Sequence, residues 1–299
     1  MRVRTLVVGL MVGGLALSAC GKSGSPTDSG SPPPSQAVAT DVKVDGSPTF
    51  DKMKSRGKII IGVKEDQPGL GFKDPTTGKY SGFDIEIARL VAAKLGFDPN
   101  DASKIEYTAV PSSGREAAIS NGNVDYYVGT YTITDKRKEQ ISFAGPYFTA
   151  GQSLLVRKDE TAITSKDTLK GKKVCSVTGS TPIQRVKEQQ LTEAANIREL
   201  QNYSQCVTQL DQKQVDAVTT DDAILKGYAA AEPDKFKLVG EPFSKEPYGI
   251  GLPKTDKALQ TKVTSILQTA LDDGSWDKIY ANTLGKSGSP ATKPTLDKS

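Results

Sequence analysis

Short apolar, β-branched runs alternate with helix-like patterns over most of the chain. Residues 58–63 have the composition of a buried strand, and a helical spacing of Phe83, Ile87 and Leu90 follows. A chain that alternates strands and helices in this way folds as an α/β protein with largely parallel sheets. Further strands are expected at residues 105–110, 124–129, 153–157, 173–177, 197–200, 215–220 and 236–239. Further helices are expected at residues 115–121, 135–140, 182–195, 206–212, 223–231 and 257–281.

The N-terminus has the composition of an export signal. Arg2 and Arg4 precede an apolar stretch at residues 6–17, which is too short to span a bilayer comfortably. The stretch leads into Leu-Ser-Ala-Cys, which resembles a bacterial lipobox. This resemblance implies a signal peptide at residues 1–19 and a lipidated Cys20, whose acyl chains would hold the protein at a membrane surface. The alternative is an ordinary signal peptide that is cleaved just before Cys20.

Both ends of the chain are predicted to lie outside the folded part. Gly, Ser and Pro supply 15 of the 28 residues at positions 21–48, so this segment cannot bury enough apolar surface to offset the entropy of ordering it. We expect residues 20–49 to form a flexible tether and residues 286–299 to form a second disordered end. The folded part would then cover about residues 50–285, which is long enough for one two-lobed unit or two ordinary domains.

The chain of 299 residues contains no histidine. Ser-His-Asp and Cys-His catalysis are therefore excluded, and most catalytic zinc sites are disfavoured. The 39 Lys and Arg residues nearly balance the 35 Asp and Glu residues, and no basic run follows the export signal. A nucleic-acid partner is therefore disfavoured as well. We expect no metal, no cofactor and no catalytic residue.

Export also bears on the two cysteines that remain after Cys20, because an exported protein meets an oxidising environment. Cys175 lies in a predicted strand and Cys206 near a predicted helix start, and both belong to the same half of the chain. We predict a disulfide between Cys175 and Cys206. Two buried thiols are the alternative.

Open α/β sheets place ligand-binding groups beyond the carboxyl ends of their strands. Thr132 follows the predicted strand at residues 124–129, and Arg137 lies in the first turn of the next predicted helix. A cation at that position opposes the helix dipole, which indicates that it faces an anion. Arginine offers a planar fork for a carboxylate, to which Thr132 could add a hydroxyl and an N–H. A surface salt bridge from Arg137 to Asp135 or Glu139 is the alternative.

Two further strand ends carry polar groups. Thr181-Pro182 has the form of a helix start, and the amides around Ser180 can cradle an anion there. Asp221 ends a strand that is predicted to be buried, where a carboxylate suits a ligand ammonium. An ordinary helix cap is the alternative in both places. Together, a carboxylate clamp and an ammonium acceptor complement the backbone of an α-amino acid.

Seven segments carry a resemblance to a known family: residues 58–63, 82–84, 129–137, 143–147, 169–174, 215–218 and 246–249. In order and without large gaps, they resemble the extracellular amino-acid-binding proteins that serve ABC importers (family 3 of the solute-binding proteins). The similarity runs from about residue 56 to residue 285. Within the family, the sequence looks most similar to the glutamate-binding lipoproteins.

This resemblance implies the two-lobed fold of the type II periplasmic binding proteins. Each lobe would be a mainly parallel sheet flanked by helices, and the ligand would bind in the cleft between the lobes. Two crossing strands, near residues 151–156 and 247–252, would join them. Lobe 1 would cover residues 50–152 and 248–285, and lobe 2 would cover residues 153–247.

The resemblance also implies a set of ligand contacts. In the matching positions, Arg137 and Thr132 would bind the α-carboxylate with help from amides near Ser180. Asp221 and the carbonyl of Thr130 would bind the α-ammonium. The full set of implied ligand-binding residues is Lys64, Ser112, Arg115, Thr130, Thr132, Arg137, Gly179, Ser180, Tyr203 and Asp221.

The resemblance extends to ligand selectivity. Lys64 matches a basic residue of relatives with acidic ligands, and Ser112 and Arg115 match their Ser-x-x-Arg loop. The side chain of glutamate must meet such a cation because an unpaired buried charge is very costly, whereas glutamine would leave the cations without a counter-charge. The alternative is that Lys64 and Arg115 are solvated surface charges. Many relatives carry an aromatic ring where this chain has Gly69, so that ring is missing or is supplied by Phe72.

The leading hypothesis is a monomeric receptor, anchored by lipid to the outer face of the cytoplasmic membrane. It would capture an L-amino acid, with glutamate favoured over aspartate and glutamine, and deliver it to the transmembrane subunits of an ABC permease. An enzyme on the same fold, such as a dehydratase or a cell-wall hydrolase, is an alternative in which Glu65 or Asp66 could act as a general acid. An amino-acid sensor that signals through a partner is a third possibility.

Overall fold

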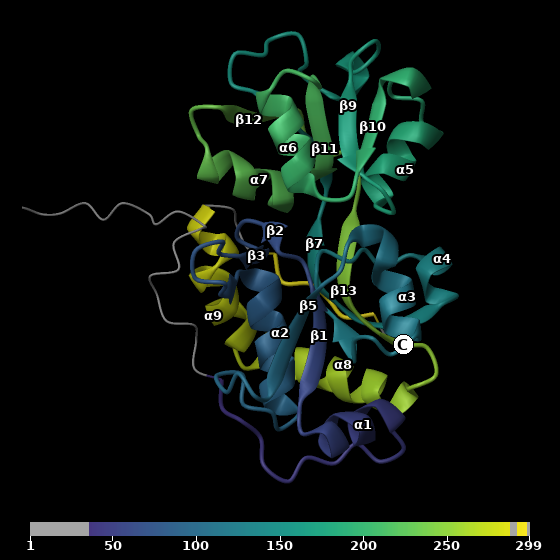
Figure 1. Cartoon of the computed structure of the whole chain (residues 1–299), viewed down its shortest axis with the longest axis vertical. Helices are drawn as coiled ribbons and strands as arrows, with labels where there is room; N and C mark the ends of the chain where they lie inside the picture. Colours follow the sequence, from purple (N-terminus) through teal and green to yellow (C-terminus); the bar gives the residue numbers. More distant parts are fainter. Residues whose placement is uncertain (1–35, 288–291, 298–299) are drawn as a thin grey trace, which may run out of the picture.

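Two five-stranded sheets form the centres of two lobes within residues 36–287 and 292–297, which the computed structural model describes (Figure 1). In lobe 1 the strand order is β5 (Ile105–Ala109), β1 (Ile59–Val63), β6 (Tyr126–Tyr127), β13 (Glu246–Pro253) and β7 (Ile141–Ala150). In lobe 2 it is β10 (Ile197–Leu200), β9 (Val174–Val177), β11 (Ala217–Asp221), β8 (Gln152–Arg157) and β12 (Phe236–Val239). A small sheet in lobe 1 has the order β2 (Asp66–Gln67), β3 (Gly71–Lys73) and β4 (Tyr80–Ser81).

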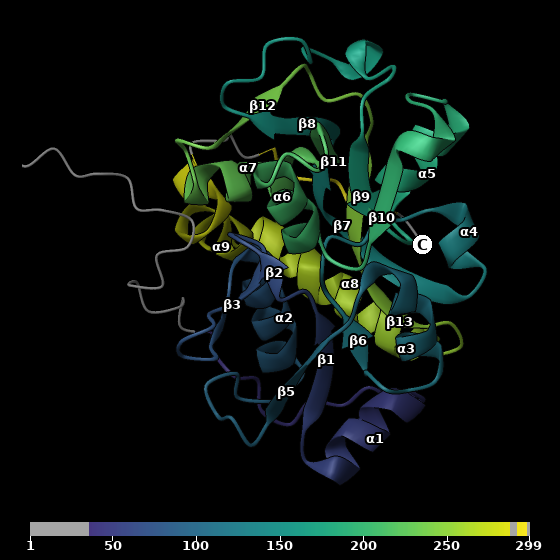
Figure 2. The same cartoon turned by 45° about the horizontal axis from the view of Figure 1, so that its top comes forward.

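Helices flank both sheets. In lobe 1 these are α1 (Pro48–Arg56), α2 (Phe83–Lys94), α3 (Arg115–Ser120), α4 (Asp135–Lys138), α8 (Lys257–Asp272) and α9 (Ser275–Asn282). In lobe 2 they are α5 (Thr181–Glu188), α6 (Tyr203–Asp211) and α7 (Asp222–Ala231). Figure 2 shows how α6 and α7 lie against β2, so the small sheet of lobe 1 faces the helices of lobe 2.

The predicted α/β architecture is confirmed, and each sheet is mixed. Strands β5, β1 and β6 are parallel, as are β10, β9 and β11. In contrast, β13 and β7 pair antiparallel in lobe 1, and β8 and β12 run antiparallel to their neighbours in lobe 2. The antiparallel pairing of β7 and β13 follows from their path, because they cross between the lobes in opposite directions (Figure 1).

The first crossing strand differs from the prediction. Residues 151–156 were expected to cross between the lobes, but nearly all of them belong to β8 in the sheet of lobe 2. The crossing strand is β7, which pairs with β13 as far as Ala150 and Glu246. Pro146 interrupts the strand pattern in the sequence, and the structure accommodates it where the register between β7 and β13 shifts.

Two predicted helices are shorter than expected. Helix α5 ends at Glu188 rather than near residue 195. The helix expected at residues 257–281 is divided into α8 and α9, and Gly274 between them has a φ of 78°, which a helix cannot contain. These breaks lie outside the ligand-binding region and leave the predicted layers unchanged.

The N-terminal boundary of the fold also differs from the prediction. The N–H of Ala39 donates to the carbonyl of Ala93 (2.9 Å), and the side chain of Ser47 donates to Asp256 (2.8 Å). The expected flexible tether is therefore wrong for residues 36–49, which pack on lobe 1. The expected signal peptide and lipidation site lie outside the described residues. Among the residues that are described, no helix combines the length and apolarity needed to cross a bilayer.

The C-terminal boundary needs a similar correction. A disordered end was expected at residues 286–299, but Leu296 packs against the core of lobe 1. The N–H of Asp297 donates to the carbonyl of Gly145 in β7 (2.9 Å). Residues 292–297 therefore belong to the folded part of the chain.

Cys175 and Cys206 form the predicted disulfide, with their Cα atoms 5.6 Å apart. The bond ties the start of α6 to β9 in the centre of lobe 2. The two cysteines are 31 residues apart in sequence, so the bond also restricts the conformational freedom of the unfolded chain. Because α6 begins with Tyr203, the disulfide holds a predicted site residue against the sheet.

Candidate ligand-binding site

A narrow cavity of about 10 Å³, enough for a single water molecule, lies between the two lobes. Lobe 1 lines it with Ser112, Arg115, Thr130, Thr132 and Arg137. Lobe 2 lines it with Ser180, Thr181, Pro182, Tyr203, Asp221 and Ile224. The structure thus brings together all the predicted site residues except Lys64 and Gly179, which lie directly behind the lining.

Arg137 faces the cavity from the start of α4, which Thr134 caps. Its guanidinium donates to the carbonyls of Thr132 (2.7 Å) and Gly179 (3.0 Å), and its Nε lies 3.4 Å from a carboxylate oxygen of Glu116. The alternative of a surface salt bridge within its own helix is therefore wrong. Burial and the neighbouring Arg115 lower the pKa of Arg137 to about 10.

Arg115 lies beside Arg137 and is almost fully buried. It donates to the carbonyls of Thr130 (3.3 Å) and Gly179 (3.2 Å). The guanidinium carbons of Arg115 and Arg137 lie 4.2 and 5.0 Å from the centre of the Tyr131 ring. This shared cation–π contact stabilises two like charges side by side and gives the lobe 1 wall its positive character.

Lys64 stands behind this wall. Its Nζ donates to the hydroxyl of Ser112 (2.9 Å) and to the carbonyl of Val110 (3.3 Å). Burial, and then the nearby charge of Arg115, lower the pKa of Lys64 to about 7. Neither Lys64 nor Arg115 is a solvated surface charge, and Lys64 reaches the cavity through Ser112.

Asp221 supplies the opposite charge from the C-terminal end of β11 in lobe 2. Its Oδ2 accepts a hydrogen bond from the hydroxyl of Tyr248 (2.6 Å). Its Oδ1 is buried and has no hydrogen-bond partner within the described part of the chain. Asp221 occupies the N-cap position of α7, but its side chain does not cap that helix. Burial, and then the nearby carboxylate of Glu246, raise the pKa of Asp221 to about 7.

The start of α5 borders the same cavity. Its N-cap is Ser180, whose hydroxyl accepts from the N–H of Ile183 (3.3 Å), so the cap lies one residue earlier than the Thr181-Pro182 pair suggested. The N–H of Ser180 donates to the carbonyl of Val177 (3.1 Å) and is not directed at a ligand. The anion-binding capacity predicted here therefore belongs to the first-turn amides and to the helix dipole.

Two carboxylates near the cavity were missed by the sequence analysis. Glu246 accepts hydrogen bonds from the hydroxyls of Thr132 (2.9 Å) and Thr181 (2.7 Å). Since each hydroxyl has a single proton, both of these protons are directed at Glu246 in this form. Glu246 belongs to the Glu-Pro-Tyr-Gly segment that carried the family resemblance, and that segment was the signal for it.

Asp84 is the second missed carboxylate. It lies in the first turn of α2, where it is buried, and Gly82 takes the N-cap position of that helix. Asp84 accepts from the N–H of Thr130 (3.0 Å) and from the hydroxyl of Tyr147 (2.8 Å). Thr130 has a φ of 43°, which is unusual for a β-branched residue, so these bonds hold a strained turn at the cavity wall.

The lobes touch directly around the cavity, so the structure is a closed form. Asp66 in β2 accepts from the N–H of Ser204 in α6 (3.0 Å) and from the hydroxyl of Tyr228 in α7. Asp66 therefore contributes to the contact between the lobes and does not line the cavity, whereas Glu65 is exposed. Phe72 is absent from the cavity lining, so it does not supply the aromatic ring that many relatives carry at the position of Gly69. Ile224 contributes an apolar side chain to the lining.

Comparison with known proteins agrees with this geometry. Residues 59–286 match the model of the bacterial extracellular solute-binding proteins, family 3. The chain belongs to this family. The resemblance inferred from the sequence is thereby confirmed, together with the two-lobed type II fold.

Similar family members include proteins named for two related amino acids. The chain is 44% identical over 212 residues to the glutamine-binding protein of Geobacillus stearothermophilus, which covers 71% of this chain and 79% of that protein. It is 40% identical over 237 residues to the glutamate-binding protein GluB of Corynebacterium efficiens, which covers 77% of this chain and 80% of that protein. Among solved structures, an ancestral arginine-binding protein bound to glutamine is 37% identical with a TM-score of 0.70, covering 77% of this chain and 98% of that one.

Proposed function

We propose that this solute-binding protein captures L-glutamate between its lobes and delivers it to the permease of an ABC importer. The observation that carries the proposal is the division of charge across the cavity. Arg115 and Arg137 face it from lobe 1. Asp221 faces it from lobe 2 with a carboxylate oxygen that has no partner among the residues the structure describes. A zwitterion with one further negative charge matches this division.

The two ends of the amino acid would bind on opposite walls. Arg137 would take the α-carboxylate, together with the amide of Thr132 and the positive end of the α5 dipole near Gly179. Asp221 would take the α-ammonium through its Oδ1, and the carbonyl of Thr130 would accept a second hydrogen bond from it. Because these groups come from both lobes, the ligand favours the closed form by its differential affinity for it.

The side-chain carboxylate would lie against the cations of lobe 1. Arg115 and the hydroxyl of Ser112 would contact it, and Lys64 would add its charge through Ser112. Tyr203 borders the same space from lobe 2. The names of the relatives support a ligand of this size, since they bind glutamine and glutamate.

The proposal includes a lipid anchor at Cys20, which would hold the receptor at the outer face of the cytoplasmic membrane beside its permease. The lipobox-like sequence supports this part. Metabolic labelling with a radioactive fatty acid would test it. The wild type should incorporate the label and a Cys20→Ala variant should not. Incorporation of the label by the variant would contradict the anchor.

Isothermal titration calorimetry with glutamate, glutamine, aspartate and arginine tests the ligand assignment. One-to-one binding is expected, with glutamate tightest and recovered chemically unchanged. Arg137→Met should weaken binding by about 100-fold, or about 3 kcal/mol, because it removes the charge partner of a desolvated carboxylate. Arg89→Met is the control, because Arg89 pairs with Glu86 in α2 and is absent from the cavity lining.

Three outcomes would count against the proposal. Absence of heat with every amino acid would reject the binding role, and conversion of the amino acid would favour an enzyme on the same fold. Tighter binding of glutamine than of glutamate would keep the binding role and overturn the assignment of an acidic ligand.

A further inference from the structure

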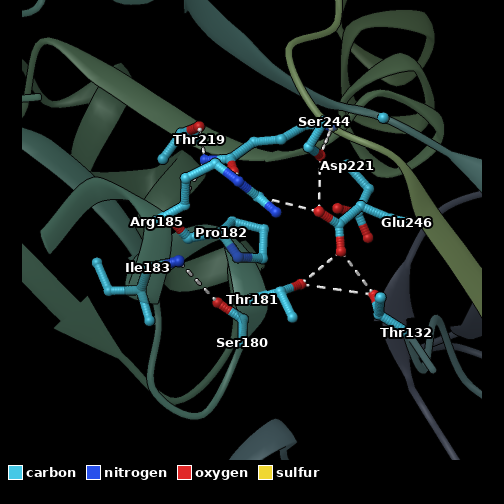
Figure 3. Close-up of polar contacts among 12 residues, drawn as sticks. Thr132, Ser180, Thr181, Pro182, Ile183, Arg185, Thr219, Asp221, Ser244 and Glu246 are labelled. Carbon is cyan, nitrogen blue, oxygen red and sulfur yellow. Dashed lines mark hydrogen bonds and ion pairs between the residues drawn. The ribbon is translucent and has the colours of Figure 1, made fainter. Parts of the chain in front are cut away.

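A buried carboxylate lies where the second crossing strand leaves lobe 2. Glu246 is the first residue of β13 and is fully buried. Figure 3 shows that its carboxylate is surrounded by donors. Its Oε2 accepts from the hydroxyls of Thr132 (2.9 Å) and Thr181 (2.7 Å), and its Oε1 accepts from the hydroxyl of Ser244 (2.6 Å) and pairs with Arg185 (2.9 Å).

These donors come from different parts of the fold. Thr132 belongs to lobe 1, Thr181 belongs to α5 of lobe 2, and Ser244 lies in the segment that leads into β13. The hydroxyls of Thr132 and Thr181 lie 3.5 Å apart, on the same carboxylate oxygen. A single atom of Glu246 therefore joins the two walls of the cavity.

The bonds to lobe 2 are well anchored. Arg185 also donates to the side chain of Gln152, which in turn donates to Thr219 of β11 (2.9 Å). Ser244 accepts from the N–H of Gln152 (2.9 Å). Glu246 is therefore fixed to lobe 2 on its Oε1 side, so the bond from Thr132 is the one that must break when the lobes separate.

We propose that Glu246 is a closure latch, a positioning residue whose carboxylate joins the lobes in the closed form and thereby sets how long the ligand stays bound. This inference rests on the proposed function, because it assumes a ligand that the lobes enclose. Closure brings a lobe 1 hydroxyl to a buried carboxylate, and hydrogen bonds to charged groups are stronger than those between neutral groups. Removing the charge should speed opening and hardly affect the encounter that precedes closure.

Stopped-flow fluorescence tests the latch. It measures the dissociation and association rates of glutamate and of glutamine for the wild type, Glu246→Gln and Glu246→Ala. In Glu246→Gln the dissociation rate should rise by about 10-fold or more, while the association rate changes by less than about threefold. Glu246→Ala should have a larger effect, because glutamine keeps one acceptor oxygen. Thr132→Val removes the lobe 1 donor of the latch, so it should act in the same direction and should not add fully to Glu246→Gln.

Two controls separate the latch from a general loss of stability. Glu86→Gln removes another buried carboxylate that pairs with an arginine, at a place remote from the cavity, and should leave the dissociation rate unchanged. Asp211→Asn removes an exposed carboxylate of lobe 2 that pairs with Lys235, and it should likewise leave the dissociation rate unchanged. A dissociation rate of Glu246→Gln within twofold of wild type, or raised no more than in Glu86→Gln, would overturn the latch alone. Absence of binding by the wild type would overturn the proposed function and the latch with it.

Discussion

The two walls of the cavity carry buried groups of opposite charge, and each wall stabilises its charge with different hydrogen-bond partners. The wall of lobe 1 gathers Arg115 and Arg137, with Lys64 behind them. Backbone carbonyls and the ring of Tyr131 stabilise these three cations, and one carboxylate, that of Glu116, lies near Arg137. The wall of lobe 2 presents Asp221, whose Oδ2 is held by the hydroxyl of Tyr248. Each wall is therefore unbalanced by itself, and a ligand with opposite charges at its two ends would balance both.

The pKa values of one buried group in each wall reflect this difference in charge. Burial lowers the pKa of Lys64 to about 7 on one side and raises the pKa of Asp221 to about 7 on the other. In each case the charged form is disfavoured because water has been removed without a full counter-charge. The lobes meet in part through the carbonyl of Gly179, which accepts from both arginines. An uncharged carbonyl joins the walls without neutralising either arginine, so their charges remain available to a ligand.

Removal of the acidic wall should have the largest effect. Asp221→Ala and Asp221→Asn should weaken glutamate binding by about 1,000-fold, or about 4 kcal/mol, because the α-ammonium would be buried without a counter-charge. In the wild type, binding should weaken as the pH falls from 7 to 5, since Asp221 with a pKa of about 7 becomes protonated over that range. Calorimetry across this pH range measures both effects.

Asp211→Asn is the matched control for Asp221. Asp211 lies in the same lobe, but it is partly exposed and pairs with Lys235. It should bind glutamate as wild type does. If Asp221→Asn also bound within threefold of wild type, the two walls would not share the ligand as proposed.

The contact between the walls can be blocked without touching a charge. Gly227 lies within α7, and a Cβ built there would approach the carbonyl oxygen of Pro68 in lobe 1 to 2.1 Å. Gly227→Ala should therefore oppose closure and weaken binding by about 30-fold, or about 2 kcal/mol. The thermal stability of the ligand-free protein should stay the same or rise, because alanine favours a helix over glycine by up to about 1 kcal/mol.

The neighbouring Lys226→Ala serves as the control for Gly227→Ala. Lys226 pairs with Asp222 on the same helix and is partly exposed. It should leave the affinity unchanged. Wild-type affinity in Gly227→Ala would show that the lobes close around the ligand by a different contact.

The walls also differ in how far the sequence predicted them. Arg137 and Asp221 could be found because they follow strand ends, where the order of the elements alone places polar groups at one edge of a sheet. Glu246 and Asp84 were missed because their partners lie far away in sequence: 114 residues separate Glu246 from Thr132, and 63 separate Asp84 from Tyr147. Local patterns contain no information about such pairs.

The fold shows the same limit. The parallel strands were predicted because each is a short apolar run next to a helical pattern. Strand β7 was missed because Pro146 breaks that run, and only its pairing with β13 makes it a strand. The direction of the Thr132 hydroxyl proton could not be predicted from the sequence either. It depends on the carboxylate of Glu246, which lies in the second crossing strand.

The smallest effect is expected for the cation behind the lobe 1 wall. Lys64→Met should lower the preference for glutamate over glutamine by about 10-fold, or about 1.4 kcal/mol, because it removes a charge that only the acidic ligand uses. With a pKa of about 7, Lys64 loses its proton as the pH rises from 7 to 9. Glutamate binding should therefore weaken over that range with uptake of a proton, while glutamine binding should change little. Calorimetry in buffers of different ionisation enthalpy measures the proton that is taken up.

Lys64→Arg separates charge from shape in this test. Arginine remains protonated at pH 9, so this variant should keep the preference for glutamate at a pH where the wild type has lost part of it. The weakening cannot come from Asp221 or Asp84. Asp84, with a pKa of about 6, is already ionised at pH 7, and Asp221, with a pKa of about 7, would strengthen binding as it loses its proton. If Lys64→Met kept both the preference and the pH dependence, the charge that recognises the acidic side chain would have to be Arg115 alone.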